Sequence, residues 1–120
     1  MYQKNILRKK YFSLRKKKYY EIDKDFFSPL ISFIKSNFKK KDFKLALYHP
    51  TSFEINVLKL LENKYMIDKS ILLPVIDENN GMNFFSWKKN RVLLVNKFGI
   101  LEPVKTSFKI PNFILVPLLA

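Results

Sequence analysis

Apolar residues recur at helical spacing in the first third of the chain. Leu7, Tyr11 and Leu14 form a narrow stripe within residues 3–20, which predicts a basic helix that docks through this stripe. A second helix is expected to begin at Ser28 as its N-cap, with Pro29 at the first helical position. Its apolar face would consist of Leu30, Ile31, Ile34 and Phe38. The lysines at 39–41 would then lie at its C-terminus, where cations meet the negative end of the helix dipole.

Shorter apolar runs later in the chain predict strands. The run ILLPVI at 71–76 is typical of a strand buried on both faces, but Pro74 cannot donate to a sheet ladder. We therefore expect this strand at a sheet edge, or its proline at a bulge or a frayed end. The apolar end of the chain predicts an inner strand, unless a further piece covers it. The other expectations are strands at 45–48, 82–87, 92–95 and 113–119, a turn at 79–81, a hairpin turn at 88–90 and a loop at 98–103.

The segment LALYHPTSFEIN, residues 45–56, places candidate chemistry at a strand-to-helix junction. Pro50 ends the predicted strand, and Thr51 opens a segment with apolar residues at helical spacing, namely Ile55, Leu58 and Leu61 or Leu60. His49, the only histidine, would lie at the carboxyl end of the strand, and Glu54 would lie in the first helical turn. Open α/β sheets bind small molecules in such a crevice, so this junction is a candidate ligand site.

Composition restricts the classes of protein that remain. With 120 residues, of which 48% are hydrophobic and 16% aromatic, we expect a single domain spanning residues 1–120 with a core of its own. The absence of cysteine excludes disulfides, thiolate metal sites and a cysteine nucleophile, and one histidine argues against a histidine-based zinc site. No apolar stretch approaches the roughly 20 residues that span a bilayer, so we expect a cytoplasmic, unexported protein.

The formal charge of +13 is concentrated in the N-terminal third. Residues 1–44 contain 14 Lys or Arg against 4 acids, whereas residues 45–120 contain 9 against 6. Such a surface can serve nucleic acid, an anionic membrane or the phosphates of a small ligand, or it can reflect a biased composition. At about 100° per residue, Lys4, Arg8 and Arg15 project within one arc of the first helix. This arc is either a phosphate-binding face or a solvated face of a docked helix.

Six segments, taken in order, resemble the 5-formyltetrahydrofolate cyclo-ligase family, also called methenyltetrahydrofolate synthetase. They are KNILR at 4–8, LALYHPTSFEIN, ILLPVI, GMNFFSW at 81–87, FGILEP at 98–103 and PNFILVPLLA at 111–120. The resemblance implies a three-layer α/β fold with an open sheet of about four to five strands and flanking helices. It also implies ATP- and Mg²⁺-dependent closure of 5-formyltetrahydrofolate to 5,10-methenyltetrahydrofolate, with release of ADP and phosphate.

The same resemblance implies roles for individual residues. The N-terminal segment, comprising Lys4, Asn5, Ile6, Leu7 and Arg8, would bind ATP, because phosphoryl transfer needs cations that hold the triphosphate in line. Glu54 would accept hydrogen bonds from the pterin, and His49 would contact the substrate without transferring a proton. Met82, Phe84 and Trp87 would form the wall of the folate site, since thioether and aromatic side chains suit a flat heterocycle.

Each of these roles has a purely structural alternative. Thr51 and Glu54 fit a capping box, in which the glutamate only returns to a free backbone amide, a contribution of about 1 kcal/mol. His49 can be a structural histidine at the end of a strand. Met82, Phe84 and Trp87 can be the core of a hairpin.

The resemblance ends where the family continues into a glycine-rich segment that closes over the ATP phosphates. This sequence stops at Ala120, and Gly81 and Gly99 are its only glycines. We therefore expect a truncated domain with negligible ligase activity alone, an aggregation-prone apolar end, and a separate C-terminal fragment as a candidate partner. Two other functions remain open. One is a nucleic-acid-binding module built on the cations and rings of residues 8–20, and the other is a noncatalytic folate-binding remnant.

Overall fold

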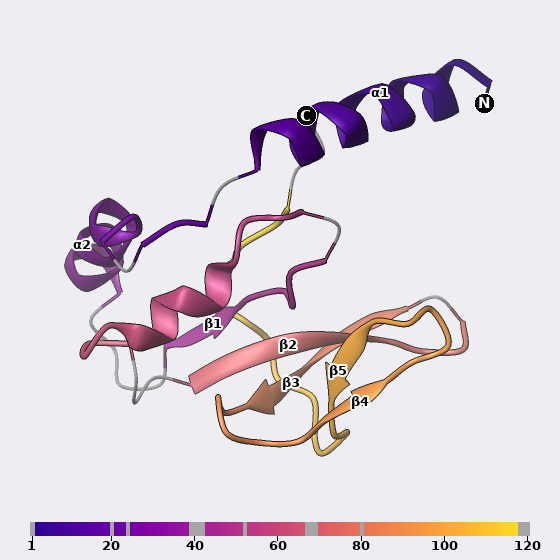
Figure 1. Ribbon diagram of the computed structural model, residues 1–120. Helices are drawn as coiled ribbons and strands as arrows, with labels where there is room; N and C mark the ends of the chain where they lie inside the picture. The colour runs from indigo at the N-terminus through magenta and orange to yellow at the C-terminus, as the bar shows by residue number, and fades with distance from the viewer. Residues whose placement is uncertain are drawn as a thin grey trace.

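A computed structural model describes residues 2–19, 21–23, 25–38, 43–51, 53–66, 70–79 and 81–117. Two helices come first, and most strands follow a short 3₁₀-helix (Figure 1). The elements are α1 (Tyr2–Lys18), α2 (Ser28–Asn37), β1 (Lys44–Ala46), η1 (Val57–Glu62), β2 (Ser70–Ile76), β3 (Met82–Trp87), β4 (Leu93–Val95), β5 (Leu101–Pro103) and β6 (Phe113–Ile114). The protein is an α/β fold with an open sheet of four strands and flanking helices, as the family resemblance implies.

The main sheet is mixed, with four strands in the order β3-β2-β1-β6. β1 runs parallel to both β2 and β6, whereas β2 and β3 form an antiparallel hairpin. β4 and β5 pair only with each other in a second, two-stranded sheet. The carboxyl ends of β1 and β2 therefore lie at the same end of the main sheet, together with the start of β3. We call this end the carboxyl edge of the sheet.

Pro74 lies in an inner strand, so the expectation of an edge position for this strand is wrong. The alternative, a proline where the pairing frays, fits the side toward β1, where the pairing ends before Pro74. The register explains why the sheet tolerates it. The Leu47 amide donates to the Leu72 carbonyl at 2.9 Å, so Pro74, two residues further on, also directs its backbone toward β1. Pairing between the two strands ends at Ala46 and Leu72, and no partner needs the missing N–H of Pro74.

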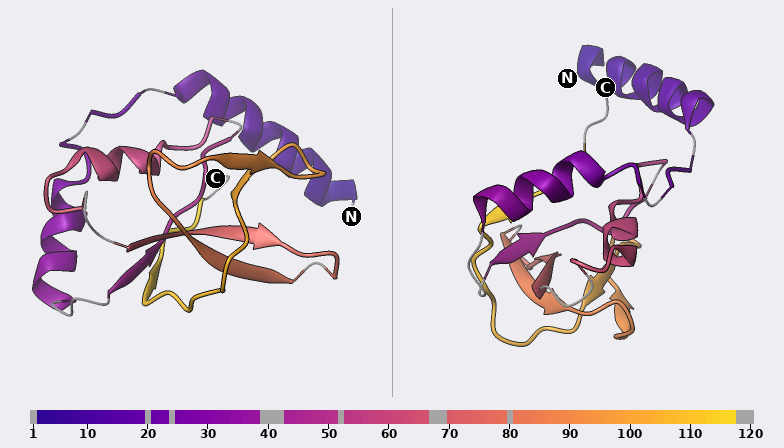
Figure 2. Two further views of the ribbon diagram at one scale, coloured as in Figure 1. Left: turned by 90° about the horizontal axis from the view of Figure 1, so that it is seen from below. Right: turned by 90° about the vertical axis from the view of Figure 1, so that its left-hand side faces the viewer.

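One face of the sheet packs under α2 and η1 (Figure 2). Leu45, Ile71 and Trp87 are register neighbours on this face. They share a core with Ile31 and Ile34 of α2 and with Val57, Leu60 and Leu61 of η1. On the opposite face, Ala46 and Leu72 are also fully buried, at 0% exposure. The run 71–76 is therefore buried on both faces along most of its length, as predicted.

Several predicted boundaries hold and others do not. The strands at 71–76 and 82–87 and the second helix are confirmed to within one residue. Ser28 is the first helical residue rather than the N-cap, which is Phe27 and has no side-chain cap. The lysines at 39–41 lie outside the described residues. The helix predicted after Thr51 begins later than expected and is of another type, because residues 53–56 contain no helix and the 3₁₀-helix η1 begins at Val57. Residue 52 lies outside the described residues.

The C-terminal half pairs differently from the prediction. A turn occurs at 88–90, closed by the Arg91 amide on the Lys88 carbonyl at 2.8 Å, but it does not form a hairpin because β4 pairs with β5. The FGILEP segment is a loop only up to Ile100, and its last three residues form β5. Among the described residues, β6 is an edge strand of two residues, and Ile114 and Val116 are exposed. The inner strand expected at 113–119 is therefore wrong for residues 113–117, while 118 and 119 lie outside the described residues. The alternative, a further piece that covers this end, stays a prediction.

The first helix forms as predicted but does not dock through the predicted stripe. Leu7 and Leu14 are 50% and 38% exposed. The helix instead approaches the rest of the protein through Phe12, whose ring lies 5.9 Å from that of Phe53 in an edge-to-face arrangement. Phe12 projects more than about 100° away from the Leu7–Leu14 stripe, so the helix is rotated relative to the expectation. Within the described residues, no helix combines the length and apolar character needed to cross a membrane.

The turn between β2 and β3 depends on one carboxylate. Asp77 Oδ1 accepts from the amides of Asn79 at 2.9 Å and Gly81 at 2.7 Å. Because hydrogen bonds to a charged acceptor contribute roughly 1.5–3 kcal/mol each at most, we expect Asp77→Ala to lower the free energy of unfolding by about 1–3 kcal/mol. Urea denaturation measures this, with Glu78→Ala on the exposed neighbour as the control. Equal effects of both variants would contradict this role of Asp77.

Candidate functional site

The loop that follows β1 is closed by hydrogen bonds across its own ends. The Tyr48 hydroxyl donates to the Ile55 carbonyl at 3.0 Å. Inside the loop, the Thr51 amide and hydroxyl donate to Glu54 Oε1 at 2.8 and 3.2 Å, and the Glu54 amide donates to the Thr51 carbonyl at 3.0 Å. These bonds hold the Glu54 carboxylate at the carboxyl edge of the parallel strands, where open sheets bind ligands.

Half of the predicted capping box is present without the helix that it was expected to start. Glu54 returns to the Thr51 amide, as a capping glutamate does. The next helical element is η1, whose own cap is Asn56, with its side chain accepting from the Leu58 amide at 3.2 Å. Glu54 therefore closes an isolated turn. Its second carboxylate oxygen has no hydrogen bond to the described residues and is a candidate anionic acceptor for a ligand.

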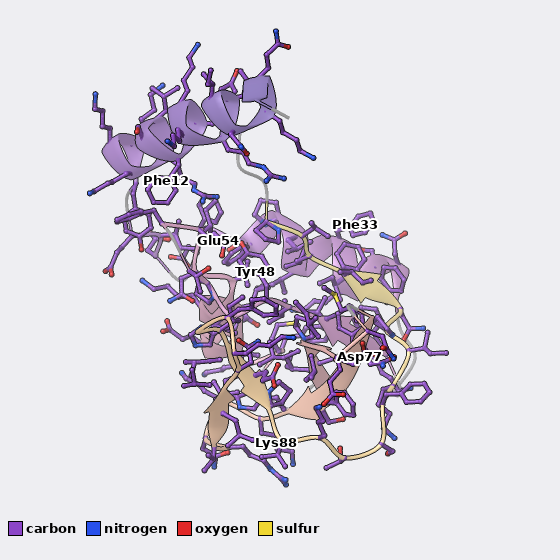
Figure 3. The ribbon with its side chains drawn as sticks, turned by 90° about the vertical axis from the view of Figure 1, so that its right-hand side faces the viewer. Phe12, Phe33, Tyr48, Glu54, Asp77 and Lys88 are labelled. Atoms are coloured by element: carbon purple, nitrogen blue, oxygen red, sulfur yellow. The ribbon has the colours of Figure 1, made fainter. Side chains whose placement is uncertain are left out.

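Tyr48, Glu54 and Arg15 interact electrostatically at this loop, and Figure 3 shows Tyr48 and Glu54 together below α1. Partial burial raises the pKa of the Tyr48 phenol above its ordinary value, because burial disfavours the phenolate. The negative charge of Glu54 raises this pKa further, while the guanidinium of Arg15 opposes the shift. The first helix thus contributes a cation to the surroundings of the loop.

This shift predicts how stability depends on alkaline pH. The folded state has the higher phenol pKa, so the contribution of neutral Tyr48 is complete below the ordinary value of about 10 and is lost as the pH rises through the folded pKa. We expect wild-type stability to fall above about pH 10 more steeply than that of Tyr48→Phe. Denaturant melts between pH 8 and 11 compare the two proteins, and identical slopes would contradict the prediction.

His49 is partly buried beside this turn and retains unused hydrogen-bonding capacity. Its Nδ1 atom is shielded from solvent and has no hydrogen-bond partner among the described residues. A buried ring nitrogen without a partner is unfavourable, and a bound ligand can supply that partner. The contact role of His49 stays a prediction.

The first helix provides a second feature of the site. Arg8, Lys9, Phe12 and Ser13 line an open hollow of about 490 Å³ on its surface. Figure 3 shows Phe12 on the side of α1 that faces Glu54 and Tyr48. A guanidinium, an ammonium and an aromatic ring around one hollow are suited to an anion joined to a flat ring system.

The predicted nucleotide segment is exposed along the N-terminal half of α1. Lys4, Asn5, Ile6, Leu7 and Arg8 are all exposed, and of these Arg8 borders the hollow. Lys4 precedes Arg15 by eleven helical residues, or about 16 Å along the axis. The structure therefore brings Arg15, rather than Lys4, close to the Glu54 loop.

The predicted hairpin wall divides between two faces of β3. Met82 and Phe84 share one face, and Met82 is 55% exposed at the edge where β2 ends. Trp87 points to the other face, where it is 6% exposed in the core and donates its indole N–H to the Arg91 carbonyl at 3.1 Å. Met82 and Trp87 are about 17 Å apart along the strand, so the structure does not bring Trp87 to Met82.

Two residues of the site were not singled out by their chemistry in the sequence. Phe12 and Phe53 connect α1 to the loop, and Phe53 has a backbone φ of 64°. A phenylalanine in the left-handed region is rare and has no sequence signature. Phe12 could have been found from its position one turn after Arg8 on the same side of the helix.

No protein-family model matches the chain, and no curated protein matches it either. Among solved structures, it is similar to the NMR structure of Aquifex aeolicus 5,10-methenyltetrahydrofolate synthetase, with 31% sequence identity and a TM-score of 0.67. The match covers 94% of this chain and 59% of the Aquifex chain. This chain therefore spans about three fifths of the length of its solved relative and has the same fold over that part.

Proposed function

We propose that this chain forms the folate-binding part of a 5-formyltetrahydrofolate cyclo-ligase, the enzyme that makes 5,10-methenyltetrahydrofolate at the expense of ATP. The observation that supports this most strongly is the 31% identity to a methenyltetrahydrofolate synthetase across 94% of the chain. The closed loop that presents Glu54 beside His49 at the carboxyl edge of the sheet is the second support. The enzyme's activity belongs to the longer protein, of which this chain corresponds to a part.

In this proposal, Glu54 binds the pterin and the side chains of β3 cover it. One carboxylate oxygen keeps the Thr51 amide, and the other accepts hydrogen bonds from pterin N–H groups. His49 Nδ1 supplies a further hydrogen bond to the substrate, which would satisfy this shielded atom. Met82 and Phe84 provide the apolar wall, while Trp87 supports the sheet from the core.

The cations of α1 hold ATP in the same proposal. Lys4 and Arg8 contact the phosphates, with Arg8 beside the hollow that Phe12 also lines. The formyl oxygen attacks the terminal phosphorus and ADP leaves. The neighbouring folate nitrogen then attacks the activated formyl carbon and loses its proton to solvent, and phosphate leaves as the ring closes. The protein's part is to align the two substrates and to neutralise charge.

Magnesium would enter with ATP. Among the described residues, no three His, Asp or Glu side chains converge as metal ligands. Mg²⁺ commonly binds through substrate phosphates and only one or two carboxylates, so ATP can bring most of its ligands. Its chemistry here would be to neutralise the phosphate charge during transfer.

The direct test uses the purified 120-residue chain. We expect it to bind 5-formyltetrahydrofolate in isothermal titration calorimetry but to form negligible methenyltetrahydrofolate with Mg–ATP. The reason is that the chain corresponds to 59% of its solved relative and lacks a glycine-rich phosphate loop. Robust turnover by this chain alone would contradict the need for a separate C-terminal fragment, which we propose as its partner. Binding without turnover, even after such a fragment is added, would indicate a noncatalytic folate-binding remnant.

A nucleic-acid-binding function is the second candidate, because the basic helix is open to solvent. Seven of the eight Lys and Arg side chains of α1 are exposed, and Arg15 is partly buried. Counterion release makes binding of nucleic acid fall steeply with salt, whereas a folate site responds much less. Tight, salt-sensitive binding of single-stranded RNA, together with no binding of the folate, would favour this second function.

A further inference from the structure

The first helix is joined to the site loop by a small cluster of rings. Phe53 lies at its centre, with ring centroids 5.9 Å from Phe12 and 5.8 Å from Tyr19, both at an interplanar angle of 66°. The Lys16 ammonium lies 5.7 Å from the centroid of the same ring. Phe53 therefore contacts three side chains from the C-terminal part of α1 and the residues just after it, while the rest of the helix stands away from the sheet (Figure 1).

The backbone of Phe53 is held in an unfavourable conformation to make these contacts. Its φ of 64° is the only positive value at a non-glycine residue in the described part of the chain. Such a conformation persists when the surrounding structure imposes it. Here the bonds between Thr51 and Glu54 span Phe53 and fix the turn on both sides of it. As a result, the ring of Phe53 points toward α1, and the carboxylate of the next residue, Glu54, lies in the candidate folate site.

We propose that Phe53 is a positioning residue that couples folate binding at Glu54 to nucleotide binding on α1. This proposal rests on the proposed function. A folate that binds Glu54 fixes the turn, and the turn fixes the Phe53 ring against Phe12. Phe12 lies one turn after Arg8 on the same side of the helix, and both line the hollow on α1. Ordering the ring cluster therefore orders Arg8, so that each substrate strengthens the binding of the other.

Phe53→Gly separates the ring from the turn. Glycine adopts a positive φ without strain, so this variant should keep the turn and the fold while it deletes the ring. Phe53→Tyr keeps the ring and is the conservative rescue. Phe108→Ala is the matched control, because Phe108 is 61% exposed and makes no ring contact among the described residues.

Two measurements apply to all four proteins. The first is the rate of hydrogen exchange of the backbone amides at 13–18 without ligand. We expect Phe53→Gly to raise this rate about tenfold, because the free energy of an edge-to-face ring pair corresponds to about a tenfold change in the opening equilibrium. The second is the dissociation constant of 5-formyltetrahydrofolate with and without Mg–ATP. We expect ATP to tighten binding about fivefold or more in wild type, Phe53→Tyr and Phe108→Ala, and to have no effect in Phe53→Gly.

The outcomes separate this proposal from the proposed function. Unchanged exchange in Phe53→Gly, or ATP-dependent tightening that survives in that variant, would overturn the positioning role even if the folate binds. Absence of folate binding in the wild type would contradict the proposed function. In that case raised exchange in Phe53→Gly would still support Phe53 as the anchor of α1, and the coupling would be rejected.

Discussion

Replacing Glu54 with glutamine is expected to weaken 5-formyltetrahydrofolate binding by roughly 10- to 100-fold, because a hydrogen bond to a charged group contributes about 1.5–3 kcal/mol. Glutamine can still accept from the Thr51 amide, so the turn that Glu54 now closes should remain. What it loses is the anionic oxygen that the pterin N–H groups would share. Titration calorimetry of the two proteins measures the difference.

Glu62→Gln is the matched control for this change, since Glu62 is exposed at the end of η1. It removes the same charge from a residue outside the loop. Circular dichroism would establish that both variants keep the fold. Unchanged folate affinity in a folded Glu54→Gln protein would mean that Glu54 serves the turn alone, as the capping-box interpretation holds.

A double charge reversal at Lys4 and Arg8 is expected to lower the affinity for Mg–ATP by at least about tenfold, because each phosphate contact by a cation is replaced with repulsion. Both side chains are exposed on α1, so the fold should tolerate the change. At position 4, in the first turn of α1, a carboxylate is also favourable to the helix dipole. Equilibrium dialysis with labelled ATP gives the affinity.

The control is Lys17→Glu with Lys18→Glu, which alters the net charge equally at the other end of the same helix. Specific phosphate binding predicts a much larger loss for the Lys4 and Arg8 pair. Equal losses for the two pairs would indicate nonspecific attraction by the basic helix, and would remove the nucleotide role of residues 4–8.

The parts of the fold that depend on local pattern were predictable. The bounds of β2 and β3 follow from the sequence almost without error, because each is an apolar run next to turn residues. Their pairing with each other was not predicted, since the sequence pattern favours a hairpin between 82–87 and 92–95. The pairing of β4 with β5 was not predicted, because the sequence of a three-residue strand does not indicate which strand it pairs with. Asn96 favours the pairing of β4 with β5 by closing the turn between them. Its side-chain oxygen accepts hydrogen bonds from the amides of Phe98 at 2.8 Å and Ile100 at 3.0 Å, and the turn contains Gly99 at a positive φ.

The orientation of the first helix could not be obtained from its periodicity. The helix has one apolar stripe around Leu7 and Leu14 and a separate apolar residue at Phe12. Which of the two sides of the helix faces the rest of the protein depends on the residue that it contacts. That residue is Phe53, whose ring direction depends on a positive φ. Helix periodicity gives the faces but not the contact.

The sequence identifies individual residues of the candidate site, but it does not show which of them the fold brings together. The strand end, Thr51 and Glu54 are local in sequence, and the structure brings them together. The family resemblance implied one wall of the folate site made of Met82, Phe84 and Trp87. Strand alternation places Trp87 on the other face, and the burial of its ring in the helical core follows from that parity.

The most direct test of the central claim is the site of folate binding on the isotope-labelled chain. Chemical shifts of backbone amides would be followed by NMR as 5-formyltetrahydrofolate is added. We predict shifts concentrated at residues 48–51, 53–56 and 82–84, around the loop that presents Glu54 and the start of β3. Shifts confined to the exposed face of α1, or no shifts at saturating ligand, would contradict a folate site at the carboxyl edge of this sheet.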